Sequence, residues 1–218
     1  IDLSAGTVRL EGPLDATGGS ISNADGERDR AVHVQGDILL AANSLSIAGG
    51  DVHLDGAIAG AEVVPATDPP TTRRVDLSIA ASGETRLGSS ADLRSLSISS
   101  SGDSVVLGGD VVADRSIAIA FEGTGTGTVS NAGSDVTLRT NRVELAASDS
   151  SETDGRTAQI ALGEGVNLDL DAITGTTLAP ATLVLDQDGA IDSAAVSRLA
   201  DAASGVTDLS LALRSNDA

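Results

Sequence analysis

The sequence predicts an all-β fold, a right-handed parallel β-helix (solenoid) of about ten turns of roughly 22 residues, with one short helix near the C-terminus. A pair of branched aliphatic residues, one position apart, recurs every 19 to 26 residues along the 218-residue chain. The chain contains one Phe and no Trp, Tyr, Met or Cys, so Val, Ile, Leu and Ala supply its apolar content. Regular spacing of this kind is typical of a solenoid, in which each repeat buries its apolar side against its neighbours.

Alternation of apolar and polar residues within each pair directs two side chains inward and the middle one outward. Further short apolar segments follow most pairs, and the 25 glycines permit the tight corners between them. Three strands per turn therefore give a triangular coil about 45–50 Å long. The ten pairs are Val8/Leu10, Val32/Val34, Val52/Leu54, Val75/Leu77, Leu96/Ile98, Ile117/Ile119, Val136/Leu138, Ile160/Leu162, Leu183/Leu185 and Leu209/Leu211.

An antiparallel β-sandwich is the alternative fold, because its strands also recur at short intervals. A sandwich of this size needs larger core residues, and it gives no reason for a longer period that repeats the same pair. Right-handedness follows from the strong preference of parallel strand connections for that hand. The single Phe121 is expected to fill a local gap in the aliphatic interior.

Three segments interrupt the period. Residues 61–74 hold three of the five prolines, and residues 148–157 are polar, so both are predicted to be loops inserted between turns. Residues 192–204 predict a helix, with Asp192 or Ser193 at its start and Gly205 after its end. Its apolar face is expected to hold Val196, Leu199, Ala200 and Ala203.

The whole chain, 1–218, is interpreted as a single solenoid segment. It opens inside a strand-like phrase, and neither end carries a covering element that this pattern identifies. Uncovered strand edges invite further pairing. We therefore expect the neighbours of this segment to be more solenoid turns, either of the same polypeptide or of other copies stacked end to end.

The net charge is −19, with 24 Asp and 8 Glu against 13 Arg and no Lys. Such a surface repels nucleic acid and anionic lipid. No apolar run is long enough to cross a bilayer as a helix. A solvated acidic coat is the expected state, weak surface calcium binding is the alternative, and no cofactor is predicted.

The middle residues of the ten pairs are expected to form one outward row. Arg9, His33, His53 and Asp76 follow one another in it, and the positions from Ala118 to Ser210 are uncharged. These positions are interpreted either as a strip covered by a partner or by loops, or as a chance run. Two imidazoles and a carboxylate are ligands for zinc or copper. Side chains stacked in a line do not converge on one point, so the histidines are interpreted as solvated surface residues.

No catalytic, cofactor-binding or metal-ligating residue is assigned. The Gly-Thr run at 123–128 lacks the Lys of a phosphate loop and is interpreted as a corner. Asp169 and Asp171 alternate with leucines and point outward as a surface pair, without the aromatic platforms of a sugar-cleaving site. A threonine array that binds ice needs a ladder over many turns, which the pairs do not provide.

The segments GDILLAANSLSIAGGDVHL (36–54) and SDVTLRTNRVEL (134–145) resemble the repeats of filamentous-haemagglutinin-like and autotransporter-type bacterial exoproteins. The resemblance covers roughly residues 36–185 and is one of repeat texture. It implies a right-handed β-helical shaft outside the cell that displays an adhesive part. This chain departs from the family in its lack of Lys and its strong negative charge.

These observations predict a non-enzymatic structural or adhesive shaft of a bacterial cell-surface or extracellular filament protein. Its partners would be further solenoid turns, copies of itself or a surface or matrix ligand, and neither nucleic acid nor a membrane. The loop at 61–74 and the helix at 192–204 are the expected contact points. The alternatives are a self-assembling fibre or lattice subunit and a carbohydrate-active β-helix enzyme.

Overall fold

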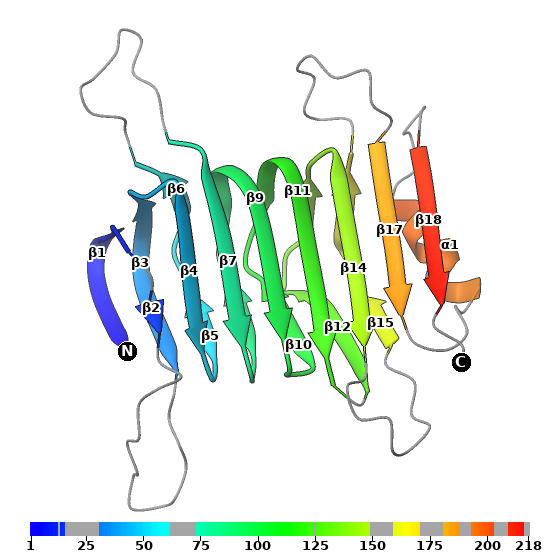
Figure 1. Ribbon diagram of the computed structural model, residues 1–218, viewed down its shortest axis with the longest axis horizontal. Helices are drawn as coiled ribbons and strands as arrows, with labels where there is room; N and C mark the ends of the chain where they lie inside the picture. The colour runs from blue at the N-terminus through cyan, green and yellow to red at the C-terminus, as the bar shows by residue number, and fades with distance from the viewer. Residues whose placement is uncertain are drawn as a thin grey trace, which may run out of the picture.

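The computed structural model describes residues 1–12, 14–15, 31–61, 73–123, 125–148, 159–170, 181–187, 193–202 and 209–215. These residues are almost all β, with one 18-stranded sheet whose pairings are parallel and one short helix, α1 (Ser193–Ala202) (Figure 1). The prediction of an all-β, parallel-stranded fold is therefore confirmed, and α1 lies inside the segment predicted to be helical.

The strand pairings form three ladders, which we call A, B and C. Ladder A contains β2 (Leu14–Asp15), β4 (Ser44–Gly49), β7 (Val75–Ala81), β9 (Ser90–Ser100), β11 (Val111–Glu122), β14 (Arg142–Ser148), β17 (Ala181–Gln187) and β18 (Leu209–Ser215). Ladder B contains β1 (Asp2–Leu10), β3 (Val32–Leu40), β5 (Val52–Leu54), β8 (Thr85–Leu87), β10 (Ser104–Leu107), β12 (Thr126–Asn131) and β15 (Gln159–Leu162). Ladder C contains the second parts of β1 and β3, then β6 (Ile58–Gly60), the first parts of β9 and β11, β13 (Val136–Arg139) and β16 (Val166–Asp169).

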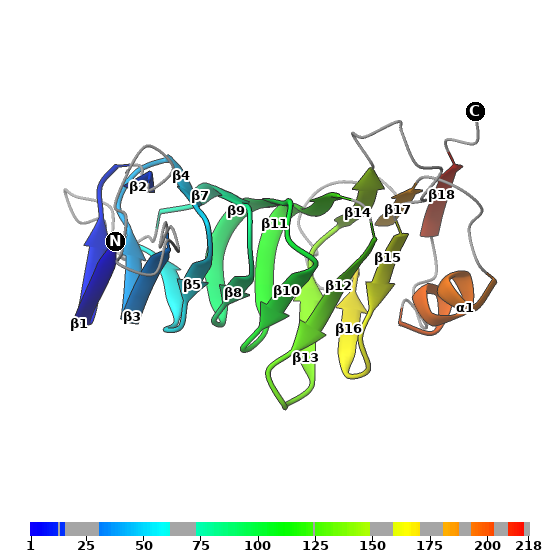
Figure 2. The same cartoon turned by 90° about the horizontal axis from the view of Figure 1, so that it is seen from below.

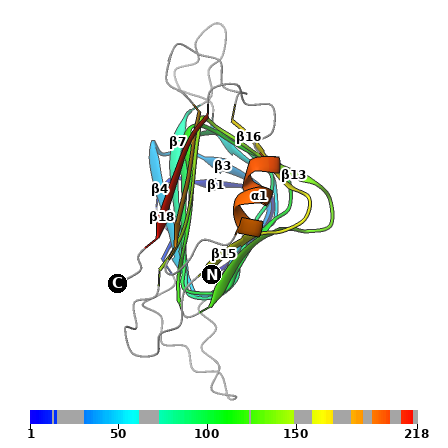
Figure 3. The same ribbon diagram turned by 90° about the vertical axis from the view of Figure 1, so that its right-hand side faces the viewer.

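The chain visits ladders B, C and A in that order, pass after pass. Viewed end-on, ladder A lies on one side of the interior, and β13 and β16 of ladder C lie on the other (Figure 3). Turned by 90° from Figure 1, the view in Figure 2 shows successive passes side by side along the long axis.

The spacing of the passes differs from the prediction. Within the described residues the chain makes eight passes through ladder A, so the prediction of ten turns of about 22 residues is wrong. Partners on ladder A are 19 residues apart from Leu77 to Leu96 but 40 apart from Val143 to Leu183. The regular pairs were misleading because all three ladders carry the same in–out–in pattern, so pairs from different ladders were counted as one series. Ile117/Ile119 lies on ladder A, Val136/Leu138 on ladder C and Ile160/Leu162 on ladder B.

The core consists of aliphatic side chains stacked in register. On ladder A two inward columns run without interruption through β4, β7, β9, β11, β14 and β17, and every member is at most 2% exposed. Stacking like on like from pass to pass lets a narrow interior exclude water without large aromatic residues. The columns are Leu45, Leu77, Leu96, Ile117, Val143 and Leu183, and Ile47, Ile79, Ile98, Ile119, Leu145 and Leu185.

Phe121 fills a gap in the interior, as predicted. It occupies the third inward column of ladder A, between Ser100 and Ala147, and is 4% exposed. A Cβ placed on Gly127 of β12 would lie 2.1 Å from its ring. The ring therefore takes the space that the small residues on either side and the missing side chain of Gly127 leave open.

The corners are held by aspartates that bond to the following pass. The backbone N–H of Glu84 donates to Asp51 Oδ1 at 2.8 Å, and that of Thr137 donates to Asp110 Oδ1 at 2.8 Å. The short Asp side chain suits this role because its oxygens reach backbone amides that a longer side chain overshoots. This arrangement accounts for part of the excess of Asp over Glu.

One corner requires glycine on successive passes. Gly36 has a φ of 90°, in the left-handed region that glycine favours. A Cβ on Gly56, on the next pass, would lie 1.9 Å from the carbonyl oxygen of Gly36. The passes come this close because parallel strands are only about 4.8 Å apart.

Helix α1 takes the place of strands on the last pass. The chain passes from β17 through α1 to β18, so ladders B and C end at β15 and β16 while ladder A continues. The helix packs on β15 and β16, where Leu199 is 4% exposed and joins the core cluster, whereas Ala200, expected on the same face, is exposed. Asp192, Ala203 and Gly205 lie outside the described residues.

The two predicted insertions fall mostly outside the described residues, which leave out 62–72 and 149–158. The ends of the first meet, because Arg73 N–H donates to the carbonyl oxygen of Ala61 at 2.9 Å.

Replacing Phe121 by Ala should lower the free energy of unfolding by about 3–5 kcal/mol, since it opens a cavity that the rigid ladders cannot close. Urea unfolding followed by far-UV circular dichroism measures the change. Glu122→Ala, at the exposed neighbouring position, is the control and should cost less than about 1 kcal/mol. Equal effects of the two substitutions would show that Phe121 is not a core residue.

Candidate functional site

The predicted outward row of pair-middle residues is not a single row. Ladder B brings His33 and His53 into register, but the next residue along is Arg86. Asp76 lies on ladder A and Arg9 on ladder C, opposite Leu39. The prediction that His33 and His53 occupy adjacent rungs is confirmed, and the prediction that Arg9 and Asp76 flank them in the same row is wrong.

The two histidines form a compact polar cluster with two carboxylates. The imidazole rings are 5.6 Å apart between centroids and nearly perpendicular, at 87°. His33 Nε2 lies 2.7 Å from Asp55 Oδ2, and His53 Nε2 lies 3.2 Å from Glu84 Oε1. The imidazole side chains are 30% and 27% exposed, so the cluster is half-buried on the surface of ladder B.

His53 Nε2 and Glu84 Oε1 are within ion-pair distance but do not form a hydrogen bond. The Nε2 atom is shielded from solvent and makes no hydrogen bond within the described residues, although Glu84 Oε1 is within 3.2 Å. Glu84 instead accepts a hydrogen bond from Arg86 Nη2 at 3.1 Å. Glu84 thus sits between an imidazole and a guanidinium, and His53 keeps an uncommitted ring nitrogen.

Asp55 and Glu84 were not identified from the sequence. Neither belongs to an aliphatic pair: Asp55 follows the inward Leu54, and Glu84 precedes β8. Only the alignment of β3, β5 and β8 brings them beside the histidines. Within the described residues no three His, Cys, Asp or Glu side chains are arranged to hold a metal ion together.

A second cluster of charges lies where ladders A and C meet. Arg94 Nε donates to Asp76 Oδ1 at 2.8 Å, and a second contact joins Arg94 Nη2 to Asp76 Oδ2. Arg74 joins Asp92 Oδ1 at 3.1 Å and Asp114 Oδ2 at 3.2 Å. These contacts tie three passes together next to the base of the 61–74 segment.

The hydrogen bonds from Arg94 lower the pKa of the Asp76 carboxyl below its usual value, against an opposing effect of burial. The same hydrogen bond raises the pKa of the Arg94 guanidinium. Both side chains remain at least a third exposed, so the pair contributes little to stability.

The outer surface of ladder A carries small residues over its first strands. Ser46, Ser78, Ser97 and Ala118 are in register on β4, β7, β9 and β11. The row then continues with Glu144, the buried Val184 and Ala212. The predicted uncharged strip from Ala118 to Ser210 is therefore wrong, because Thr137 and Ala161 belong to other ladders and a glutamate follows Ala118.

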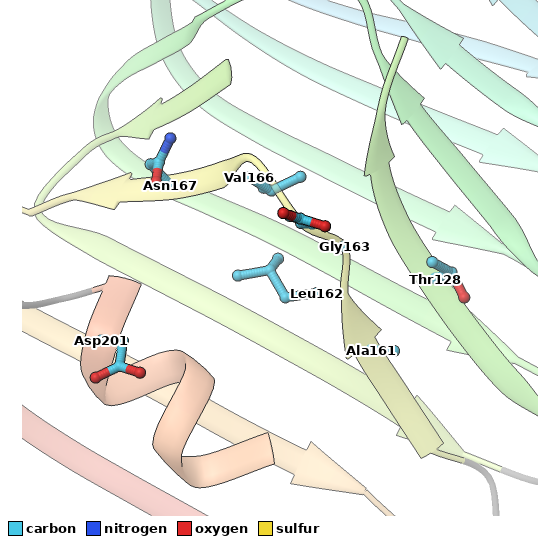
Figure 4. Close-up of a pocket in the computed structure, with 8 residues that line it drawn as sticks. Thr128, Ala161, Leu162, Gly163, Val166, Asn167 and Asp201 are labelled. Carbon is cyan, nitrogen blue, oxygen red and sulfur yellow. The ribbon is translucent and has the colours of Figure 1, made fainter. Parts of the chain in front are cut away.

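An open pocket of about 640 Å³ lies between α1 and the end of ladder B (Figure 4). Its charged lining residues are Glu164 and Asp201, both exposed, and no basic or aromatic side chain lines it among the described residues. The other lining residues are Thr128, Ala161, Leu162, Gly163, Val166 and Asn167.

The remaining sequence candidates show no reactive geometry. The 123–128 run includes the first three residues of β12, so a strand, and not the helix of a phosphate loop, follows Gly125. Asp169 lies 3.1 Å from Arg139 Nε across ladder C, and Asp171 is outside the described residues.

No family model matches the chain, and neither a curated protein nor a solved structure matches it. Within the described residues no helix is long and apolar enough to span a membrane.

Asp76→Asn should destabilise the protein at neutral pH by less than about 1 kcal/mol, because it breaks an exposed pair. The lowered pKa means that this contribution is present above the unfolded-state value near 3.9 and is lost as the pH falls through the folded-state value. Urea unfolding at pH 7 and at about pH 2 should therefore show a difference between wild type and variant at the first pH only.

Arg94→Gln, alone and combined with Asp76→Asn, is the matched control for this pair. The double variant should be no less stable than either single variant if the two residues act through each other. A difference between wild type and Asp76→Asn that persists unchanged at the lower pH would contradict the assignment.

Proposed function

We propose that the chain is a right-handed parallel β-helix that serves as a non-enzymatic structural and adhesive shaft of a bacterial cell-surface or extracellular filament protein. A β-helix requires the chain to visit its sheets in a constant order, and this chain passes through ladders B, C and A in that order. Right-handedness rests on the general preference of parallel connections. The cellular setting rests on the resemblance of segments 36–54 and 134–145 to exoprotein repeats.

The observation that carries the proposal is the unbroken pair of aliphatic columns on ladder A. Every rung from β4 to β17 contributes two side chains at most 2% exposed. An interior of this kind has no room for a substrate, and it gives each pass the same resistance to bending and peeling as the next. Such a protein acts as a rigid spacer.

The surface supports the same function. A net charge of −19 keeps neighbouring shafts apart and does not attract nucleic acid or anionic lipid. Arginines bond along and across the passes, as Arg139 does with Asp169 and Arg74 with Asp92 and Asp114, so much of the described polar surface is engaged in holding passes together.

A self-assembling fibre is the second candidate. Within the described residues β1 and β18 each pair with only one other strand, and Leu213, on the inward side of β18, is 42% exposed. Unpaired edges and an exposed core residue favour addition of further strands. These strands would come from the same polypeptide or from a second copy. Against direct stacking of copies, ladder A extends past ladders B and C, where α1 lies.

The purified chain should be a monodisperse elongated particle in small-angle X-ray scattering and negative-stain electron microscopy. It should release no reducing ends from neutral or acidic polysaccharides. Fibres that lengthen with concentration would establish the self-assembly alternative instead.

Release of reducing sugar would overturn the shaft proposal if it disappears in Glu164→Gln or Asp201→Asn, the two carboxylates of the open pocket. The control is Asp186→Asn, a carboxylate of β17 outside that pocket, which should leave any such activity unchanged. A compact scattering profile would equally contradict an elongated shaft.

A further inference from the structure

We propose that the His33–His53 pair of ladder B binds one divalent transition-metal ion of the zinc and copper class. The two residues come from adjacent parallel strands, β3 and β5, and are direct register partners. Their side chains leave the same side of the sheet, and each is flanked by inward residues that are buried. The proposal is independent of the shaft function.

The spacing of the two rings suits a shared ion. Parallel strands place register partners about 4.8 Å apart, and the ring centroids are 5.6 Å apart. An ion bound by two imidazole nitrogens at about 2.0–2.1 Å lies between rings at such a separation. The strands are held by ladder hydrogen bonds on both sides, since β3 also pairs with β1 and β5 with β8, so the pair is largely preorganised.

The ring nitrogens are supported by carboxylates. Asp55 Oδ2 lies 2.7 Å from His33 Nε2, and Glu84 Oε1 lies 3.2 Å from His53 Nε2. As positioned, no three such side chains in the described part of the chain meet at one point, so two imidazoles hold the ion and water fills the other positions. Both carboxylates lie beside the Nε2 atoms themselves, so their role is to offset the charge of the ion.

A second observation that points to a ligand is the Nε2 atom of His53, which lacks a hydrogen bond within the described residues. This atom is also shielded from solvent. A buried ring nitrogen without a partner loses the hydrogen bonds that it makes in water. A metal–nitrogen bond satisfies this atom.

Four charged side chains surround the pair. Asp55 faces His33, Glu84 faces His53, and Arg86 occupies the next rung but is itself paired with Glu84 at 3.1 Å. Asp51, at the corner before β5, accepts the backbone N–H of Glu84 and holds it in place. The carboxylates next to both rings favour a bound cation.

The chemistry of the ligands sets selectivity. Imidazole favours copper, nickel and zinc, with copper bound most tightly, whereas calcium and magnesium prefer oxygen. Selectivity matters here because a surface of charge −19 attracts any cation loosely. A site at the histidines is distinguished from this loose attraction because it binds copper and zinc more tightly than calcium and magnesium.

Isothermal titration calorimetry on tag-free protein at pH 7.5, with ZnCl₂ and CuCl₂, should show one ion bound per chain and a tighter site for copper. CaCl₂ and MgCl₂ at the same ionic strength should show no such site. Both zinc and copper should raise Tm.

Matched variants locate the site. His33→Gln and His53→Gln should each weaken zinc binding at least tenfold, and the double variant should abolish it. Asp55→Asn should weaken it about tenfold, because it removes a negative charge next to His33 Nε2. Val106→Gln, two rungs from His53 on the same row, is the control and should bind zinc as wild type does. Far-UV circular dichroism checks that each variant is folded.

Copper in the unaltered protein gives a second measurement that needs no variant. Substoichiometric Cu²⁺ should broaden the ring-proton resonances of the two histidines before any others. The proposal is overturned if the histidine variants bind zinc as tightly as wild type, if calcium gives the same isotherm, or if copper broadening spreads over the carboxylate-rich surface.

Discussion

The structure depends on one constraint, which is that equivalent inward side chains lie directly above one another from pass to pass. Parallel pairing fixes the axial spacing, and the alternation of side chains fixes which residues face inward. Leucine then lies over leucine on β4, β7 and β9, with isoleucine over isoleucine beside it, and both columns are shielded from solvent. A shift of one residue on any strand would turn its whole inward set to the solvent. The register is therefore more strongly specified than the length of the chain between passes.

The variable chain length between passes explains which parts of the fold could be predicted from the sequence. The strand class, the aliphatic interior, the role of Phe121 and the presence of α1 follow from local patterns, because each depends on the residues of one strand or helix. The number of passes does not, since pairs such as Val52/Leu54 and Val75/Leu77 look alike but lie on ladders B and A. Thr85 is buried in register with Val52 and Val105, so a polar residue occupies an inward position and interrupts the alternation of apolar and polar residues.

The contacts between polar surface side chains were harder to predict from the sequence than the core. Adjacent histidines on ladder B were expected from their positions in two successive pairs, but Asp55 and Glu84 approach them from corners whose placement depends on chain length between strands. The same holds for Arg74, which reaches Asp92 and Asp114 on two later passes. Local periodicity identifies side chains that face solvent, whereas their partners are set by the winding of the chain. The surface clusters are thus properties of the ladders and not of any one segment.

The most direct test of this account uses the absence of cysteine from the chain. Ser78 and Ser97 are outward register partners on β7 and β9, whereas Ser46 lies one rung further away, on β4. Register partners are about 4.8 Å apart and two rungs about 9.6 Å, and only the first separation is within reach of a disulfide. Mild oxidation should therefore cross-link Ser78→Cys/Ser97→Cys within one chain and leave Ser46→Cys/Ser97→Cys reduced. Efficient cross-linking of the second pair, or none of the first, would contradict the stacked register on which the fold and the proposed shaft depend.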